Sequence, residues 1–222
     1  FFELSPGEFF GVVLPPALLS LVLIALLCLR LPAENLQVRF SSPLEPLPRK
    51  RLLLFAALLA LCLLTVFRII PWYITLTITV AVLAVWAREL FAKVDYALLA
   101  TFVFFFIFAG NLGEIPEART FFMNLMQSTP LTASVLASQF ISNVPAAVLL
   151  ADFTQNASAL LAGVDVGGLG TPVASLASLI SLKLYLRTPE AQPKRYLGVF
   201  LGLNFAFLIV VYGLSVLLTG SF

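Results

Sequence analysis

Long apolar stretches alternate with short polar segments along this chain. A helix of about 20 apolar residues spans the roughly 30 Å hydrocarbon core of a membrane. We therefore expect transmembrane helices in the following runs: Phe9–Leu31, Leu52–Ile70, Trp72–Leu90, Tyr96–Leu112 and Tyr196–Leu218. Pro15 and Pro16 predict a kink within the first run. The predicted fold class is an all-α integral membrane protein, built as a polytopic helix bundle.

Two further apolar segments, Phe121–Thr154 and Ala157–Leu186, are interrupted by helix-breaking residues. The first break is Ser142–Pro145, and the second is the glycine-rich stretch Gly167–Pro172. Irregular backbone at membrane depth is tolerated only where it is buried in protein or lines a polar cavity. Two breaks so close in sequence therefore indicate a transport site, although a pair of proline-glycine kinks in an ordinary bundle would give a similar pattern.

The basic residues predict how the interrupted segments enter the membrane. Cytoplasmic loops are rich in Lys and Arg, which places the basic stretch 32–51 inside and the acidic stretch 113–117 outside. If residues 121–154 crossed the membrane fully, the basic end of the next segment, at 183–195, would face the outside. A re-entrant hairpin that enters and leaves from the outside avoids this conflict, so the charge pattern favours it.

Segment lengths agree with a hairpin followed by a discontinuous transmembrane helix. Pro130–Ile141 would rise about 18 Å as a helix, roughly half a bilayer, with Ser142–Pro145 at the tip. Ala157–Val166 would then descend about 15 Å before the glycines interrupt it. Proline suits the first turn of a helix, so Pro172 is expected to begin the second half. Both breaks reach the same depth, and we expect them to meet.

Composition supports the membrane assignment and excludes several chemistries. Hydrophobic residues make up 61% of the chain and charged residues 11%, less than half of the roughly 25% in soluble domains. The net charge of +2, with basic residues confined to loops, argues against a nucleic-acid partner. Histidine is absent from the sequence, and Cys28 and Cys62 lack metal-ligand spacing, which excludes zinc sites and histidine-based triads. The expected environment is the cell (inner) membrane, with the lipid bilayer as partner.

The two breaks supply the candidate binding residues. A helix that starts inside the membrane presents free N–H groups and a positive dipole end, while unwound backbone offers carbonyl oxygens to cations. The candidate substrate- or ion-binding residues are Ser142, Asn143, Val144, Pro145, Gly168, Gly170, Thr171, Pro172 and Ser175. A Na⁺ ion is expected at Asn143, Gly170 and Thr171. Asp165 is a candidate for proton or ion coupling, or it faces the outer water about two turns from Thr171.

These breaks also resemble a known group of transporters. Ser142-Asn143-Val144-Pro145 is similar to the Ser-Asn-Thr hairpin tip of dicarboxylate carriers, with Val-Pro in place of the threonine. Residues 163–179, GVDVGGLGTPVASLASL, resemble the arsenite permease pattern. The chain thus resembles the citrate-transporter-like ion transporter superfamily, which includes dicarboxylate/citrate carriers and arsenite permeases.

The resemblance implies a secondary transporter of two inverted repeats, with an elevator-type movement against a homodimeric scaffold. Its substrate would be an organic anion or an arsenite-like oxyacid, with Na⁺ or H⁺ as coupling ion and no other cofactor. Both breaks lack lysine and arginine, which favours a small or neutral oxyacid.

The segment order matches one repeat and the end of another, so we expect a longer parent with its own amino-terminal hairpin. The implied division is: last span of a first repeat (1–31), cytoplasmic linker (32–51), three scaffold-side spans (52–112), outer surface helix and re-entrant hairpin (113–156), broken helix (157–186), and cytoplasmic loop with the final span (187–222). The alternative is a non-transporting membrane subunit or a truncated structural fragment. An enzyme is not expected, because the sequence has no visible nucleophile–base pair or metal cluster.

Overall fold

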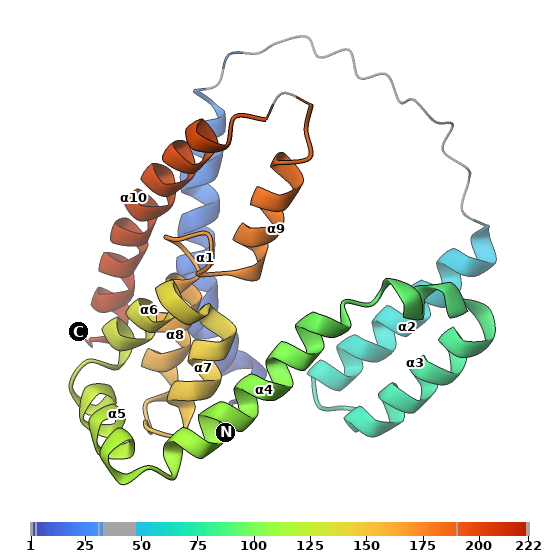
Figure 1. Cartoon of the computed structure of the whole chain (residues 1–222), viewed down its shortest axis with the longest axis horizontal. Helices are drawn as coiled ribbons and strands as arrows, with labels where there is room; N and C mark the ends of the chain where they lie inside the picture. The colour runs from blue at the N-terminus through green and yellow to red at the C-terminus, as the bar shows by residue number, and fades with distance from the viewer. Residues whose placement is uncertain (1, 3, 31, 33–47, 190, 221–222) are drawn as a thin grey trace. The chain divides into compact units, whose positions relative to one another are not determined.

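The structure, a computed structural model, describes residues 2, 4–30, 32, 48–189 and 191–220, and these are built from helices and their connections (Figure 1). The chain forms two compact units. Unit 1 comprises Phe1–Pro32 and Leu98–Phe222, and unit 2 comprises Ala33–Ala97.

Unit 1 contains long apolar helices and a set of short ones. Its helices are α1 (Pro6–Cys28), α4 (Tyr96–Gly113, of which the first two residues belong to unit 2), α5 (Pro116–Ser128), α6 (Pro130–Ile141), α7 (Asn143–Ala151), α8 (Ala157–Gly167), α9 (Leu176–Tyr185) and α10 (Pro193–Thr219).

Three helices of the described chain, α1, α4 and α10, are long and apolar enough to cross a membrane. Large apolar side chains along them are exposed, as at Leu21, Phe104 and Ile209. Water would disfavour so much exposed apolar surface, whereas lipid accommodates it. The predicted class, an all-α membrane helix bundle, is confirmed.

The buried core of unit 1 lies around α8 rather than around the long helices. Seven of the eleven residues of α8 are buried. Helices α6 and α7 contact it, and so do α1 and α10, which also contact each other (Figure 1). Helix α8 is therefore the central element against which both ends of the chain pack.

Close packing between α6 and α8 depends on small residues. An added Cβ on Gly163 would lie 2.6 Å from the Leu131 carbonyl oxygen, and one on Gly167 would lie 2.6 Å from Ser138 Oγ. Small residues four positions apart allow membrane helices to approach this closely. The packing fixes the relative position of the two segments that end at the breaks.

Unit 2 contains α2 (Arg49–Val66), α3 (Trp72–Trp86) and the 3₁₀ helix η1 (Arg88–Lys93). The hydroxyl groups of Thr65 and Thr75 lie 2.5 Å apart and join α2 to α3. Arg51 and Glu89 form an ion pair of 3.3 Å. Both side chains are about half exposed, so the pair contributes little to stability.

Three predicted boundaries in unit 2 are wrong. The second span was expected to reach Ile70, but α2 ends at Val66. The linker was expected to reach Arg51, but α2 begins at Arg49; the rest of the predicted linker, residues 33–47, lies outside the described residues. The third span was expected to reach Leu90, but α3 ends at Trp86 because Ala87 leaves the helical region with φ −155° and ψ 50°. Arg88 Nε then donates to the Ala84 carbonyl, so the charged side chain folds back onto the helix end.

Candidate functional site

The turn between α6 and α7 consists of a single residue, Ser142. Its φ of 72° and ψ of 152° fall in a region occupied almost only by glycine. Such a conformation costs about 1–3 kcal/mol and persists only where surrounding contacts hold it. A four-residue tip was predicted, and that boundary is wrong: Asn143, Val144 and Pro145 already belong to α7. Proline is accommodated there because the first turn of a helix needs no partner for its N–H groups.

The second break is an unwound segment, residues 168–175, between α8 and α9. Pro172 was expected to begin the second half-helix, but α9 begins at Leu176. Ser175 caps it instead, because its hydroxyl oxygen accepts a hydrogen bond of 3.2 Å from the Ser178 amide. The segment between Gly167 and Ser175 is thus longer than the glycine run alone indicates.

Gln139, near the end of α6, holds this unwound segment in place. Its Nε2 donates to the carbonyl oxygens of Gly167 at 2.9 Å and Leu169 at 3.0 Å. Its Oε1 accepts from the Thr171 amide at 3.0 Å, and the Thr171 hydroxyl donates to the Gln139 carbonyl at 2.9 Å. Gly170 adopts φ +105°, and an added Cβ there would collide with the Gln139 side chain.

The hairpin turn also contacts the unwound segment directly. The main-chain N–H of Asn143 donates to the Ala174 carbonyl at 2.9 Å, and Ser142 Oγ donates to the same oxygen at 3.4 Å. The two breaks, expected to meet, therefore lie side by side and are joined by hydrogen bonds at both Gln139 and Ala174.

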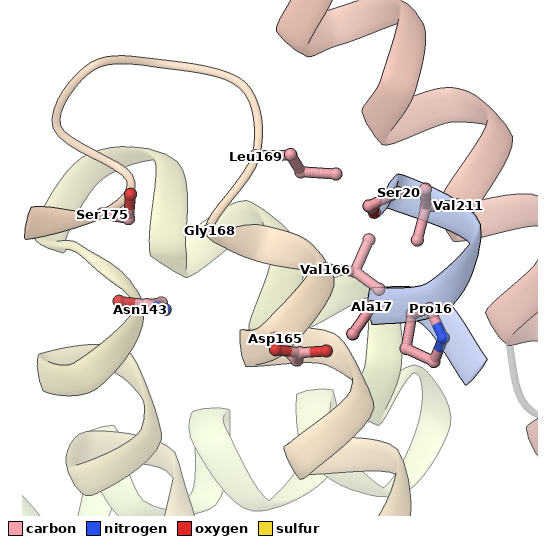
Figure 2. A pocket seen from close by; sticks show the side chains of 10 residues that line it. All are labelled: Pro16, Ala17, Ser20, Asn143, Asp165, Val166, Gly168, Leu169, Ser175 and Val211. Carbon is pink, nitrogen blue, oxygen red and sulfur yellow. The ribbon is translucent and has the colours of Figure 1, made fainter. Parts of the chain in front are cut away.

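A cavity of about 260 Å³ lies next to this junction (Figure 2). Its lining residues come from α1, α7, α8, α10 and the unwound segment: Pro16, Ala17, Ser20, Asn143, Asp165, Val166, Gly168, Leu169, Ser175 and Val211. Four predicted site residues therefore share one cavity, namely Asn143, Asp165, Gly168 and Ser175. An added Cβ on Gly168 would lie 3.2 Å from Asn143 Nδ2, so glycine leaves room there for the amide.

The other predicted site residues lie elsewhere around the junction. Ser142 contacts Ala174, and Thr171 is bonded to Gln139. These two, with Val144, Pro145, Gly170 and Pro172, are not among the described residues that line the cavity. Of the three residues expected to hold Na⁺, only Asn143 lines it.

Sequence reasoning missed Gln139 and Ser20. Gln139 carried a usable signal, because an amide inside a short apolar helix, three residues before a break, needs hydrogen-bond partners. Ser20 lies in a long apolar run, and only its packing against α8 brings it to the cavity. No local feature of the sequence points to it.

The cavity offers oxygen-rich chemistry with one acidic group. Asp165 contributes a carboxylate, Asn143 an amide, and Ser20 and Ser175 contribute hydroxyl groups. Among the described residues, no lysine or arginine lines it. A carboxylate in this position disfavours a bare anion and favours a cation, a proton or a neutral molecule rich in hydroxyl groups.

The chain is similar to two curated membrane proteins. It is 41% identical over 92 residues to an uncharacterized transporter of Methanocaldococcus jannaschii, a match that covers 41% of this chain and 26% of that protein. It is 38% identical over 113 residues to the inner membrane protein YbiR of Escherichia coli, covering 49% of this chain and 30% of that protein. The matches thus span less than a third of either relative.

No family model matches the chain, and no solved structure gives a significant match. The partial matches and the apolar helices together describe a multi-pass inner membrane protein, and one of its two relatives is named as a transporter. The narrower resemblance to the citrate-transporter-like superfamily stays a prediction.

Proposed function

We propose that this chain is part of a secondary active transporter of the inner membrane, with its substrate site at the cavity beside Asn143, Asp165 and Ser175. The main support is that two helix breaks meet and leave a polar cavity next to them. Broken helices that face each other at mid-membrane are the usual binding arrangement of repeat-built transporters. A relative named as a transporter and one named as an inner membrane protein point in the same direction and away from an enzyme.

In this proposal, α6 and α7 form a re-entrant hairpin, and α8 and α9 are the halves of one discontinuous transmembrane helix. The chain supplies one of two inverted repeats, which moves as an elevator against a homodimeric scaffold. The three spans of residues 52–112 would belong to that scaffold. These features are proposed from the resemblance to the citrate-transporter-like superfamily.

The cavity chemistry favours a small oxyacid that is uncharged at neutral pH, as arsenous acid is. Such a solute donates its hydroxyl protons to Asp165 and accepts from the Asn143 amide, and it brings no charge to repel the carboxylate. An organic anion would need a bound Na⁺ or proton beside Asp165 before it could enter. For an organic anion, the acidic lining therefore requires that the substrate enter together with a cation or a proton.

Asn143→Ala is expected to reduce uptake at least about tenfold, because the cavity loses an amide worth about 0.5–1.5 kcal/mol per hydrogen bond and its shape changes. Uptake of labelled arsenite and citrate by cells expressing the complete protein measures this. The matched control is Asn204→Ala on α10, where the side chain donates to the Phe200 carbonyl 2.9 Å away and lies outside the cavity lining. Equal uptake by the two variants, at equal expression, would exclude the assigned site.

Asp165→Asn is expected to abolish the accumulation of substrate that a Na⁺ or H⁺ gradient drives. Exchange of substrate across the membrane of proteoliposomes, which needs no gradient, should continue. The amide keeps the size of the side chain but takes up no proton and holds a cation weakly. Asp152→Asn is the control, because Asp152 is exposed at the end of α7. Accumulation that survives in Asp165→Asn would remove this residue from the coupling mechanism.

A further inference from the structure

A second cavity of about 310 Å³ lies along α1, α8 and α10. Its lining residues are Gly11, Val12, Pro16, Asn156, Ser158, Ala162, Ser215 and Leu218. Pro16 also lines the first cavity, so the two cavities share one wall residue.

The two cavities follow one another along the same three helices. On α8 the lining passes from Ala162 to Asp165, about 4.5 Å further along the helix axis. On α1 it passes from Val12 through Pro16 to Ser20, and on α10 it runs backwards from Ser215 to Val211. These helices contact one another pairwise, so both cavities lie along one seam, the interface of the three helices, which runs from the start of α8 to the unwound segment.

The prolines of α1 enrich the second cavity in available carbonyl oxygens. Proline has no N–H, so each proline inside a helix deprives the carbonyl four residues earlier of its usual donor. Pro15 and Pro16 lie inside α1, and the affected carbonyls are those of Gly11 and Val12. Both of these residues line the second cavity.

Two hydroxyl groups add further oxygen atoms to a lining that also includes the apolar side chains of Val12, Ala162 and Leu218. Ser158 and the buried Ser215, which is 2% exposed, lie in the same cavity. Hard cations are bound by oxygen ligands of this kind, namely backbone carbonyls, hydroxyl groups and water. The adjoining carboxylate of Asp165 would attract a cation further along the seam.

We propose that the second cavity is a binding station for a small alkali cation on a hydrated path from the start of α8 to Asp165. The carbonyls of Gly11 and Val12 and the hydroxyl of Ser215 hold the cation. Its role in coupling rests on the proposed transport function, but its binding does not.

Cysteine labelling in the complete protein tests the path. In a background without other cysteines (Cys28→Ser and Cys62→Ser in this segment), Ser215→Cys is compared with Ser134→Cys. Both serines are buried, at 2% and 0% exposed, but Ser134 bonds the Pro130 carbonyl against α8 and lies outside both cavity linings. A positively charged thiosulfonate should modify Cys at 215 at least about tenfold faster, because only an accessible, hydrated thiol forms the reactive thiolate. Equal rates would overturn the path.

Sodium protection tests the cation site itself. At constant ionic strength, Na⁺ in place of choline should slow labelling of an Ala162→Cys variant, because Ala162 lines the same cavity but supplies no proposed ligand, and the absence of protection would overturn cation binding. Added to the Ala162→Cys variant, Pro16→Ala returns an N–H donor to the Val12 carbonyl and should raise the Na⁺ concentration for half-protection about tenfold, the equivalent of about 1.4 kcal/mol. Pro193→Ala, at the first turn of α10, is the matched control and should leave it unchanged.

If Pro16→Ala left the Na⁺ concentration for half-protection unchanged, the Val12 carbonyl would be excluded as a ligand, and the proposed site would be overturned. These readouts need no transport. Failure of Asn143→Ala to affect uptake would therefore remove the proposed function and leave the labelling results standing, and the reverse also holds.

Discussion

Alanine at Gly163 is expected to destabilise the protein strongly. The added Cβ would lie 2.6 Å from the Leu131 carbonyl oxygen and 2.6 Å from Ser134 Cβ. Neither atom can move aside by rotating a flexible side chain, so α6 and α8 must separate. Overpacking of this kind costs about 1–3 kcal/mol, a fall of about 2–12 °C in the melting temperature of a chain this size. Gel filtration of heated, detergent-solubilised protein measures this fall.

The control is the same substitution on α10. Gly198 and Gly202 have no neighbouring atom within 4 Å of an added Cβ, so alanine there should be neutral or stabilising by up to about 1 kcal/mol from helix propensity alone. Gly167→Ala should behave like Gly163→Ala, because its Cβ would meet Ser138 Oγ and Cβ at 2.6 and 2.7 Å. If alanine at 163 or 167 were as harmless as at 198, the close approach of α6 and α8 would be wrong.

The sequence predicted the elements whose signals are local. Three of the five apolar runs expected to cross a bilayer became α1, α4 and α10, whereas the runs 52–70 and 72–90 became α2 and α3, which end earlier than expected and are not among the described helices long and apolar enough to cross a membrane. The glycine stretch after residue 166 and the polar residues at 142–143 marked both helix breaks, because each interrupts a strongly apolar segment. Even the close approach of α6 and α8 has a sequence signature, since Gly163 and Gly167 are four residues apart on one face.

Features that depend on tertiary contacts were not predictable. Pro172 and Ser175 both carry helix-start signals, and the sequence alone favoured the proline. In the structure, the Thr171 amide and the Ala174 carbonyl bond to the hairpin, which keeps the intervening residues out of the helix until Ser175. The contribution of α1 to the cavity, through Pro16 and Ser20, likewise follows from packing across more than a hundred residues of chain.

Gln139→Leu is expected to abolish transport and to loosen the unwound segment. Leucine fills a similar volume but leaves the Gly167 and Leu169 carbonyls and the Thr171 amide without the side chain that bonds all three. A buried polar group that loses its partner costs about 1–3 kcal/mol; Gly167 is buried, and Leu169 and Thr171 in the same short segment are half-buried. Uptake, together with protease sensitivity between residues 167 and 175, measures the effect.

Two comparisons separate a positioning role from a general loss of stability. Gln127→Leu, on the exposed face of α5, changes the same residue types away from the junction and should leave uptake and cleavage unchanged. Gln139→Glu keeps the acceptor for the Thr171 amide but loses both donors to the carbonyls. At acidic pH the protonated carboxyl group regains one donor, so the loss of uptake should then be smaller than in Gln139→Leu and larger than in wild type. A Glu variant that transports like wild type at every pH would show that the bonds to Gly167 and Leu169 do not hold the two breaks together. The two breaks would then be held by the bonds of Thr171 to residue 139 and of Ser142 and Asn143 to Ala174.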